Sequence, residues 1–397
     1  MNPMVKHFFF VSMLVSLNST MMFSFGFIHY HQNPVFANPF QNQRLLQSAS
    51  HQTGKSKQLY SDSSKSLRAK FSPTEVDEVK IDVIVDNASD NLADIPSGFG
   101  TTQIGREVED KSGTFDPDNI CSGIHGLSLL IEAKKDGKSH TVLFDTGPSE
   151  KIFESNTKKM KTDFTKIETI VISHYHYDHT GGLLSSIRNS GTNGVTVDLH
   201  PSKPLSRGSL KNGNFIVHPT TGPEFEQIRN IDGAKLELHS EPHLILDNFF
   251  FVSGNISRTN NFEKGASAHY SKFSSEGEYE RDPGINEERY LALKVKGRGL
   301  VVCSACSHAG IINIINDAKD NTGTSEIAFV TGGFHLAGEN NDAKIVRTVN
   351  ELKKINPQLI ATGHCTGWRA QALFGVEMKE GQYTPSIAGH SFLISSR

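Results

Sequence analysis

Three histidines and one aspartate lie within six positions of this chain, at His174, His176, Asp178 and His179. They follow an apolar run at residues 167–172, which predicts a short buried strand. In extended backbone His174 and His176 project to the same side, which suits one tetrahedral ion bound by imidazole nitrogen. Asp178 and His179 follow as the chain turns into a predicted helix, so they point toward a second ion. The alternative, a histidine-rich surface loop, fits an ordered quartet poorly.

Other histidines come where further predicted strands end. His308 follows a predicted hairpin at 290–302, and His364 follows an apolar run at 358–361. His335 stands shortly after a third such run. Ligand sites in α/β sheets gather at the carboxyl ends of strands. We therefore assign His308 to the first ion and His364 to the second.

The elements that must position these residues are predicted from apolar runs and alternation. Helices are expected at 182–187 and from residue 311. Two polar stretches are expected to be loops, one that ends near residue 120 and one that ends near residue 286. The second loop is expected to lie over the active site. The strands not yet named are predicted at 79–85, 125–132, 141–144, 195–200, 249–252 and 327–330.

Composition divides the 397 residues into three parts. Residues 1–40 carry two apolar stretches behind Lys6 and His7, as in a signal peptide or an uncleaved membrane anchor. Residues 41–77 are largely polar, with few acids over most of their length, which predicts a disordered linker. Residues 78–397 are expected to form the catalytic domain. The leader predicts a secreted protein or one in the secretory pathway, with import into an organelle or membrane anchoring as alternatives.

Charge and cysteine content give weaker constraints. The formal net charge of −3 offers no global attraction for nucleic acid, so no nucleic-acid partner is expected. Contact with a membrane is expected only through an uncleaved leader. The cysteines are compatible with two disulfides in a secreted protein, although we expect them to line the metal pocket; they are Cys121, Cys303, Cys306 and Cys365.

The pattern His-x-His-x-Asp-His followed by Gly-Gly resembles the signature of the metallo-β-lactamase fold superfamily. The resemblance implies an α/β (α+β) fold, a four-layer αββα sandwich with its metal site at one edge of two sheets. It also implies chemistry by water that the metals activate. In the superfamily an Asp in the Phe-Asp-Thr-Gly position supports the metal loop by hydrogen bonds, which places Asp145 behind the ligands.

Several further motifs resemble one subgroup, the dihydropterin synthase-like group. They include His-Gly-Leu-Ser at 125–128, Cys-Ser-His-Ala-Gly-Ile at 306–311, Gly-Gly-Phe-His-Leu at 332–336 and Gly-His-Cys-Thr-Gly at 363–367. This resemblance implies a transferase that joins a pterin to a ribofuranosylaminobenzene phosphate. It runs from about residue 82 to the end of the chain.

One position departs from the superfamily pattern. Many members carry a Gly-Asp whose carboxylate bridges both metals, and this chain has Gly332-Gly333-Phe334-His335 instead. The second site is then weaker, bridged by hydroxide alone, or completed by His335. We therefore name Asp178 and His335 as the candidate catalytic residues.

These features predict a hydrolase of a phosphate ester or phosphodiester that uses a metal-bound hydroxide. Two divalent ions are expected, zinc first, with iron or manganese as alternatives. Arg258 is a candidate anchor for the phosphate oxygens of a small phosphorylated substrate. The alternatives are the synthase-like transferase, which would use the same residues, and a silent metal-binding scaffold.

Overall fold

The computed structural model describes residues 70–109, 116–191, 194–219 and 221–397. The predicted leader at 1–40 and most of the predicted linker lie outside these ranges. The last part of that linker belongs to the folded unit, because β1 (Glu75–Val76) pairs in parallel with Lys294 and Val295. Val76 is fully buried, which explains why this short strand forms at the end of a polar stretch. In the described ranges, no helix has the length and apolar character needed to cross a membrane.

Two eight-stranded sheets form the centre of the fold. Sheet A has the order β11-β12-β15-β16-β17-β18-β19, with β1 also paired to β15. Its other strands are β11 (His243–Ile245), β12 (Phe250–Val252), β15 (Leu291–Val295), β16 (Gly299–Cys303), β17 (Ile327–Gly332), β18 (Leu359–Thr362) and β19 (Tyr383–Pro385). Sheet B has the order β10-β7-β6-β5-β4-β2-β20-β3. Its strands are β2 (Glu78–Val85), β3 (Gly100–Thr101), β4 (Ser128–Lys135), β5 (Lys138–Phe144), β6 (Thr169–Val171), β7 (Val195–Leu199), β10 (Ala234–Leu238) and β20 (Ser391–Ser395).

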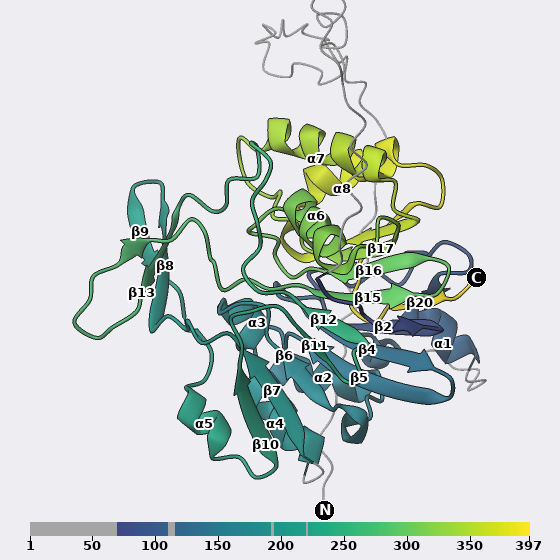
Figure 1. The fold of residues 1–397 in the computed structure, drawn as a ribbon, viewed down its shortest axis with the longest axis horizontal. Helices are drawn as coiled ribbons and strands as arrows, with labels where there is room; N and C mark the ends of the chain where they lie inside the picture. The colour runs from purple at the N-terminus through teal and green to yellow at the C-terminus, as the bar shows by residue number, and fades with distance from the viewer. Residues whose placement is uncertain (1–69, 110–115, 192–193, 220) are drawn as a thin grey trace, which may run out of the picture. The chain divides into compact units, whose positions relative to one another are not determined.

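Helices cover the outer face of each sheet (Figure 1). The helices over sheet A are α6 (Ile311–Thr322), α7 (Asp342–Ile355) and α8 (Trp368–Glu377). Those against sheet B are α2 (Glu150–Lys159), α4 (Leu183–Ser190) and α5 (Phe225–Arg229). One apolar cluster fills the space between the sheets, and one lies between each sheet and its helices. This arrangement confirms the predicted αββα sandwich.

Local sequence explains how the metal-bearing ends of the strands are set. The β4–β5 hairpin turns at Asp136-Gly137, both with positive φ, as a two-residue turn between twisted strands requires. Strands β5, β6, β7 and β10 are parallel, and so are β16, β17, β18 and β19. Parallel strands end at the same edge of their sheet. Residues that follow β6 in sheet B lie within 4.8 Å of residues that follow β16 and β18 in sheet A, so these strand ends lie at one end of the sandwich.

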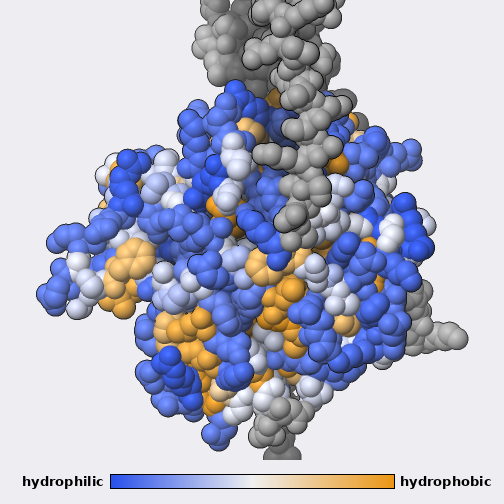
Figure 2. All heavy atoms as spheres, viewed as in Figure 1, coloured by the Kyte–Doolittle hydropathy of each residue, from blue (hydrophilic) through white to orange (hydrophobic). Residues whose placement is uncertain are grey.

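Two stretches predicted to be loops contain regular structure. The polar excursion before residue 120 holds β3 and the helix α1 (Gln103–Glu109). The region predicted as a loop up to residue 286 contributes two strands, β13 and β14, to a third sheet with the order β14-β13-β8-β9. Its strands are β8 (Ser206–Lys211), β9 (Asn214–Val217), β13 (His269–Lys272) and β14 (Glu280–Arg281). The prediction missed this sheet because its strands bury few apolar side chains. In β9, for example, Phe215, Ile216 and Val217 are about half exposed. Figure 2 shows apolar atoms on the surface of this sheet.

A buried ion pair joins the two large sheets beside the metal loop. Arg289, which precedes β15, donates to Asp198 Oδ1 in β7 at 2.7 Å and to the carbonyl of Ile172 at 2.7 Å. Burial alone would raise the pKa of Asp198, but the guanidinium of Arg289 and the ring of His243 hold that pKa well below its usual range. The pair therefore keeps the strand before the metal loop in register with sheet A.

We expect Arg289→Met to lower the free energy of unfolding by about 3–5 kcal/mol, because it removes the guanidinium from the buried Asp198 carboxylate and leaves the His243 ring as its remaining close partner. Urea denaturation measures this change. The exposed Arg281 is the control, and Arg281→Met should shift stability by no more than about 0.5 kcal/mol. Equal effects of the two substitutions would show that the buried pair has no special role.

Candidate metal centre

The loops after three strands bring buried donor side chains together. The loop after β6 carries His174 and His176 and leads into the short helix α3 (Tyr177–Thr180). The loop after β16 carries Cys306 and His308, and the loop after β18 carries His364. The imidazoles and the thiol are all buried. The two sheets thus contribute to one site from opposite sides.

The first donor group contains three imidazoles. His174 Nε2 lies 2.9 Å from His176 Nδ1, and His308 Nε2 lies 3.3 Å and 3.2 Å from these two atoms. A tetrahedral ion with metal–nitrogen bonds of about 2.0–2.1 Å separates its nitrogen ligands by about 3.3 Å. The three nitrogens therefore have the spacing of three corners of a tetrahedral site.

The second donor group contains the carboxylate and two imidazoles. His179 Nε2 lies 3.2 Å from His364 Nε2, and Asp178 Oδ2 lies 3.7 Å and 3.4 Å from these two nitrogens. The structure thus brings His174, His176 and His308 together in one group and the other three predicted ligands together in another. This nitrogen and oxygen set fits a divalent ion.

Cys306 is common to both groups. Its Sγ lies 3.2 Å from His179 Nε2 and 3.1 Å from His364 Nε2, and within 4.8 Å of the donor atoms of the first group. Burial and the neighbouring Cys365 raise the pKa of the Cys306 thiol. The sequence predicted cysteines in the pocket without separating these two from the others. Cys303 lies instead in the core between the sheets, and no disulfide joins any of the four cysteines.

Asp145 orients the metal loop from behind. Its Oδ1 accepts the Ser173 N–H at 2.8 Å, and its Oδ2 accepts the Ser173 hydroxyl at 2.7 Å and the His179 Nδ1 proton at 2.7 Å. The bond from Nδ1 to Asp145 leaves Nε2 of His179 facing the second donor group. Burial alone would lower the pKa of this imidazole, but the carboxylates of Asp178 and Asp145 raise it to about 9, so an ion bound at Nε2 would displace a proton. This is the supporting position that the Phe-Asp-Thr-Gly motif predicted for Asp145.

Asp86 supports His364 in a similar way, although the sequence alone did not single it out. Its Oδ1 accepts the His364 N–H at 2.7 Å, and burial raises the pKa of this carboxyl to about 6. The preceding Gly363 is required, because a Cβ there would lie 2.0 Å from Asp86 Oδ2. The position of Asp86 at the end of β2 was the available signal, since strand ends carry the other site residues.

Burial sets the protonation states of the first group. It lowers the pKa of His174, His176 and His308 well below the ordinary value, so these imidazoles are neutral at pH 7 and able to ligate. For Asp178, burial alone would raise the pKa, but the neighbouring His179, His125 and His364 hold it well below its usual range. The second group therefore presents a carboxylate.

Three comparisons connect this geometry with known proteins. Residues 140–237 match the family described as a beta-lactamase superfamily domain. The 7,8-dihydropterin-6-methyl-4-(β-D-ribofuranosyl)-aminobenzene-5′-phosphate synthase of Methanocaldococcus jannaschii is 32% identical over 269 residues, which cover 64% of this chain and 85% of that protein. The chain belongs to the metallo-β-lactamase superfamily.

Two further relatives agree with this membership. The uncharacterized protein MJ0448 of the same organism is 31% identical over 62% of this chain and 85% of its own length. The crystal structure of Tm1679, described as a metal-dependent hydrolase of the beta-lactamase superfamily, aligns with a TM-score of 0.58 at 25% identity, covering 80% of this chain and all of that one. The resemblance indicated by the motifs is confirmed, and the chain is an enzyme of either the hydrolase or the synthase kind.

A second layer of histidines surrounds the first donor group of this superfamily enzyme. His269 in β13 has its ring centroid 5.1 Å from that of His176, and His218, just after β9, lies 5.7 Å from the same ring. His335 packs on His308 at 4.4 Å. From the sequence, His218 stayed unassigned and His269 was not singled out. The third sheet, which supplies both, thus forms one wall of the metal centre.

The two remaining predicted residues lie outside both donor groups. His335 forms a separate group with Cys306 and Cys365, beside the first donor group rather than within the second. Arg258 donates to the carbonyl of Gly284 and to Asn286 Oδ1, so its guanidinium is held by the loop before β15. Its role as a phosphate anchor remains a prediction.

His125 lies at the exposed side of the second group. Its Nε2 is 3.2 Å from Asp178 Oδ2, its side chain is 52% exposed, and its ring lies 4.7 Å from that of His364. The hydrogen bond to Asp178 raises the pKa of His125. The histidine belongs to the His-Gly-Leu-Ser motif of the superfamily subgroup, although the sequence alone gave it no role.

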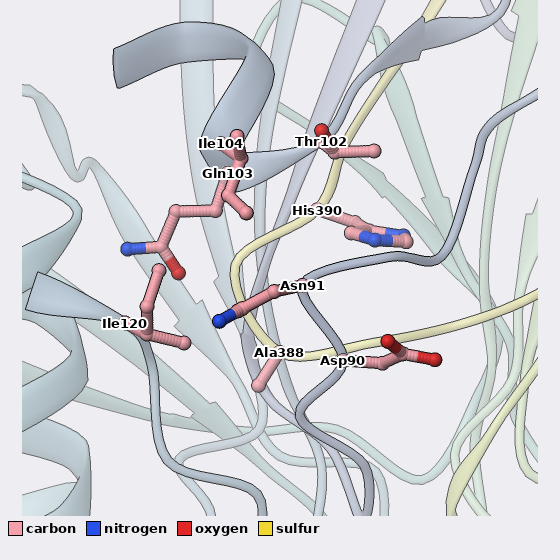
Figure 3. A pocket seen from close by; sticks show the side chains of 8 residues that line it. All are labelled: Asp90, Asn91, Thr102, Gln103, Ile104, Ile120, Ala388 and His390. Atoms are coloured by element: carbon pink, nitrogen blue, oxygen red, sulfur yellow. The ribbon is translucent and has the colours of Figure 1, made fainter. Parts of the chain in front are cut away.

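The pocket in Figure 3 is a different feature. It lies between α1, the loop before β20 and the segment after β2, and its lining contains none of the donor residues. The side chains that line it are Asp90, Asn91, Thr102, Gln103, Ile104, Ile120, Ala388 and His390. We therefore place the functional site at the two donor groups.

We expect Asp145→Asn to weaken metal binding about 10–100-fold while the fold is kept. The new amide would donate to His179 Nδ1, which moves the imidazole proton to Nε2 and blocks the ligating atom. Competition with a chelator measures the affinity. Asp136→Asn, in the exposed β4–β5 turn, is the control. Unchanged affinity in Asp145→Asn would remove the orienting role.

Proposed function

We propose that this enzyme uses two divalent metal ions to act on a phosphorylated small molecule, with hydrolysis of a phosphate ester or phosphodiester as its reaction. The observation that carries the proposal is the pair of adjacent donor groups at the carboxyl ends of strands from both sheets. The nitrogen spacings near 3.3 Å, the neutral imidazoles of the first group and the ionised Asp178 all fit two divalent ions. We retain zinc as the first choice.

Divalent ions bound in such a site lower the pKa of a coordinated water toward neutrality, which supplies a nucleophile without a protein hydroxyl or thiol. Residues of the chain would position the reacting groups and supply protons. Asp178 accepts a hydrogen bond at the second donor group, and His125 stands on its exposed side with a raised pKa. His125 is therefore our candidate to give a proton to a leaving group.

A small substrate is supported by the enclosure of the site. The donor residues are buried, and the third sheet adds His218 and His269 as a wall over the first group. The phosphate is supported by the name of the Methanocaldococcus jannaschii synthase, in which the ribofuranosyl-aminobenzene product carries a 5′-phosphate. Arg258 and His335 are retained as candidates for contact with substrate.

The second candidate function is synthase-like transfer, in which a pterin is joined to a ribofuranosylaminobenzene phosphate. The specific observation in its favour is the match to 85% of the length of that synthase. Hydrolysis and transfer would use the same donor residues and would differ in the acceptor, which is water in one reaction and an aromatic ring in the other.

We expect His176→Ala to reduce kcat on a generic phosphodiester to background while leaving the circular dichroism spectrum unchanged, because one ligand of the first group is lost. His200→Ala is the matched control, since His200 is also buried but belongs to none of the groups of possible metal ligands among the described residues, and it should retain turnover. A metal-replete His176→Ala enzyme with normal activity would contradict the assignment.

We also expect about two zinc ions per chain by elemental analysis, and loss of turnover after chelation that added zinc reverses. Product analysis with a pterin pyrophosphate, with and without an aromatic acceptor, then separates the two reactions. A coupled product formed in preference to the hydrolysed one would favour transfer. Two bound ions without either product would favour the silent scaffold.

A further inference from the structure

We propose that the thiolate of Cys306 is a ligand shared by both metal ions, in the place that a bridging carboxylate takes in many superfamily members. The inference rests on the proposed metal-dependent function and adds a donor that was not assigned from the sequence.

The position of Sγ is the first argument. Cys306 is the one residue that belongs to both four-residue donor groups formed by the described residues. A tetrahedral ion with bonds of about 2.0–2.1 Å to nitrogen and about 2.3 Å to sulfur separates these donors by about 3.5 Å. The distances of 3.2 Å and 3.1 Å from Sγ to His179 Nε2 and His364 Nε2 lie within about half an ångström of that value.

The second argument is that the usual carboxylate has no room. A Cβ at Gly333 would lie 2.7 Å from Cys365 Sγ and 2.8 Å from the carbonyl of Ala305. Position 332 leaves even less room, because a Cβ added to Gly332 would lie 1.8 Å from the carbonyl oxygen of Ser304. Phe334 packs instead into the apolar cluster under the helices of sheet A. The Gly-Gly-Phe segment therefore supplies no donor, and it lies against the loop that carries Cys306.

The chain also holds this loop in one conformation. The Ser307 hydroxyl donates to the carbonyl of Gly333 at 2.6 Å, and the Gly333 N–H donates to the carbonyl of Ala305 at 2.8 Å. The carbonyl of Cys306 accepts the Cys365 thiol at 3.3 Å. These bonds attach the loop that carries Cys306 to the end of β17, where many superfamily members have the bridging Asp. The loop that brings the thiol to the metal centre is therefore packed against the segment that lacks this Asp.

A thiolate bridge has a consequence for metal choice. Soft sulfur ligands favour zinc over manganese, whereas carboxylate and water suit manganese. Binding of the ions would release the Cys306 proton to solvent. We therefore infer a zinc-selective pair of sites.

Cobalt substitution tests the proposal with a signal that does not depend on turnover. The full chain loaded with about two Co²⁺ per chain should show a thiolate-to-cobalt charge-transfer band in the near ultraviolet. In Cys306→Ser we expect the band to disappear and the weaker ion to bind at least about ten-fold less tightly. Cys306→Asp should lack the band but recover two bound ions. Cys365→Ser is the matched control and should keep the band, and thermal melting checks that each variant is folded.

The outcomes are separable. A wild-type chain that binds no Co²⁺ would overturn the proposed function itself. Two bound ions without the band, or a band that persists in Cys306→Ser, would overturn only the role of Cys306. A band lost in Cys365→Ser and kept in Cys306→Ser would assign the ligand to Cys365 instead. If Cys306→Ser fails to fold, Cys306→Asp decides the test. The charge-transfer band must then be absent from Cys306→Asp, and a band that persists there would overturn the role of Cys306.

Discussion

The site exists only while two separate sheets hold a fixed relation to each other. Sheet B supplies His174, His176, Asp178 and His179, and sheet A supplies Cys306, His308 and His364. The dry cluster between the sheets provides the bulk of the attachment, but apolar packing alone tolerates small displacements. Directional bonds across the gap remove that freedom. The Arg289 guanidinium bonds to the end of β7 and to Ile172, and the Asp86 carboxylate bonds to the backbone of His364.

The residues of the site that could be predicted are those whose role can be inferred from neighbouring positions in the sequence. Three imidazoles and a carboxylate in one short loop form most of a metal-binding donor set by themselves, and His308 and His364 were recognisable because each follows an apolar run. The αββα architecture followed from the resemblance, and its strands from apolar runs. Asp145 could be placed because its Phe-Asp-Thr-Gly motif resembles the one that supports the metal loop in the superfamily.

The residues that were missed depend on tertiary contacts. Cys306 belongs to a residue type with several roles, and only the folded structure separates it from Cys303, three positions earlier and buried in the core. His269 sits in β13, whose sequence His-Tyr-Ser-Lys has no apolar period to mark it as a strand. Asp86 and His125 act through partners far along the chain, His364 and Asp178, and no spacing in the sequence reveals such pairs.

The order of strands in sheet B has a consequence for how the enzyme is made. Strand β20 follows every other strand in the chain, yet it lies between β2 and β3 and pairs with both. On a ribosome, β2 is synthesised early and one of its edges stays without its partner until residues 391–395 emerge. The sheet that carries the metal loop is then completed only after synthesis of nearly the whole folded unit. Until then, a nascent chain must keep this exposed strand edge from pairing with other chains.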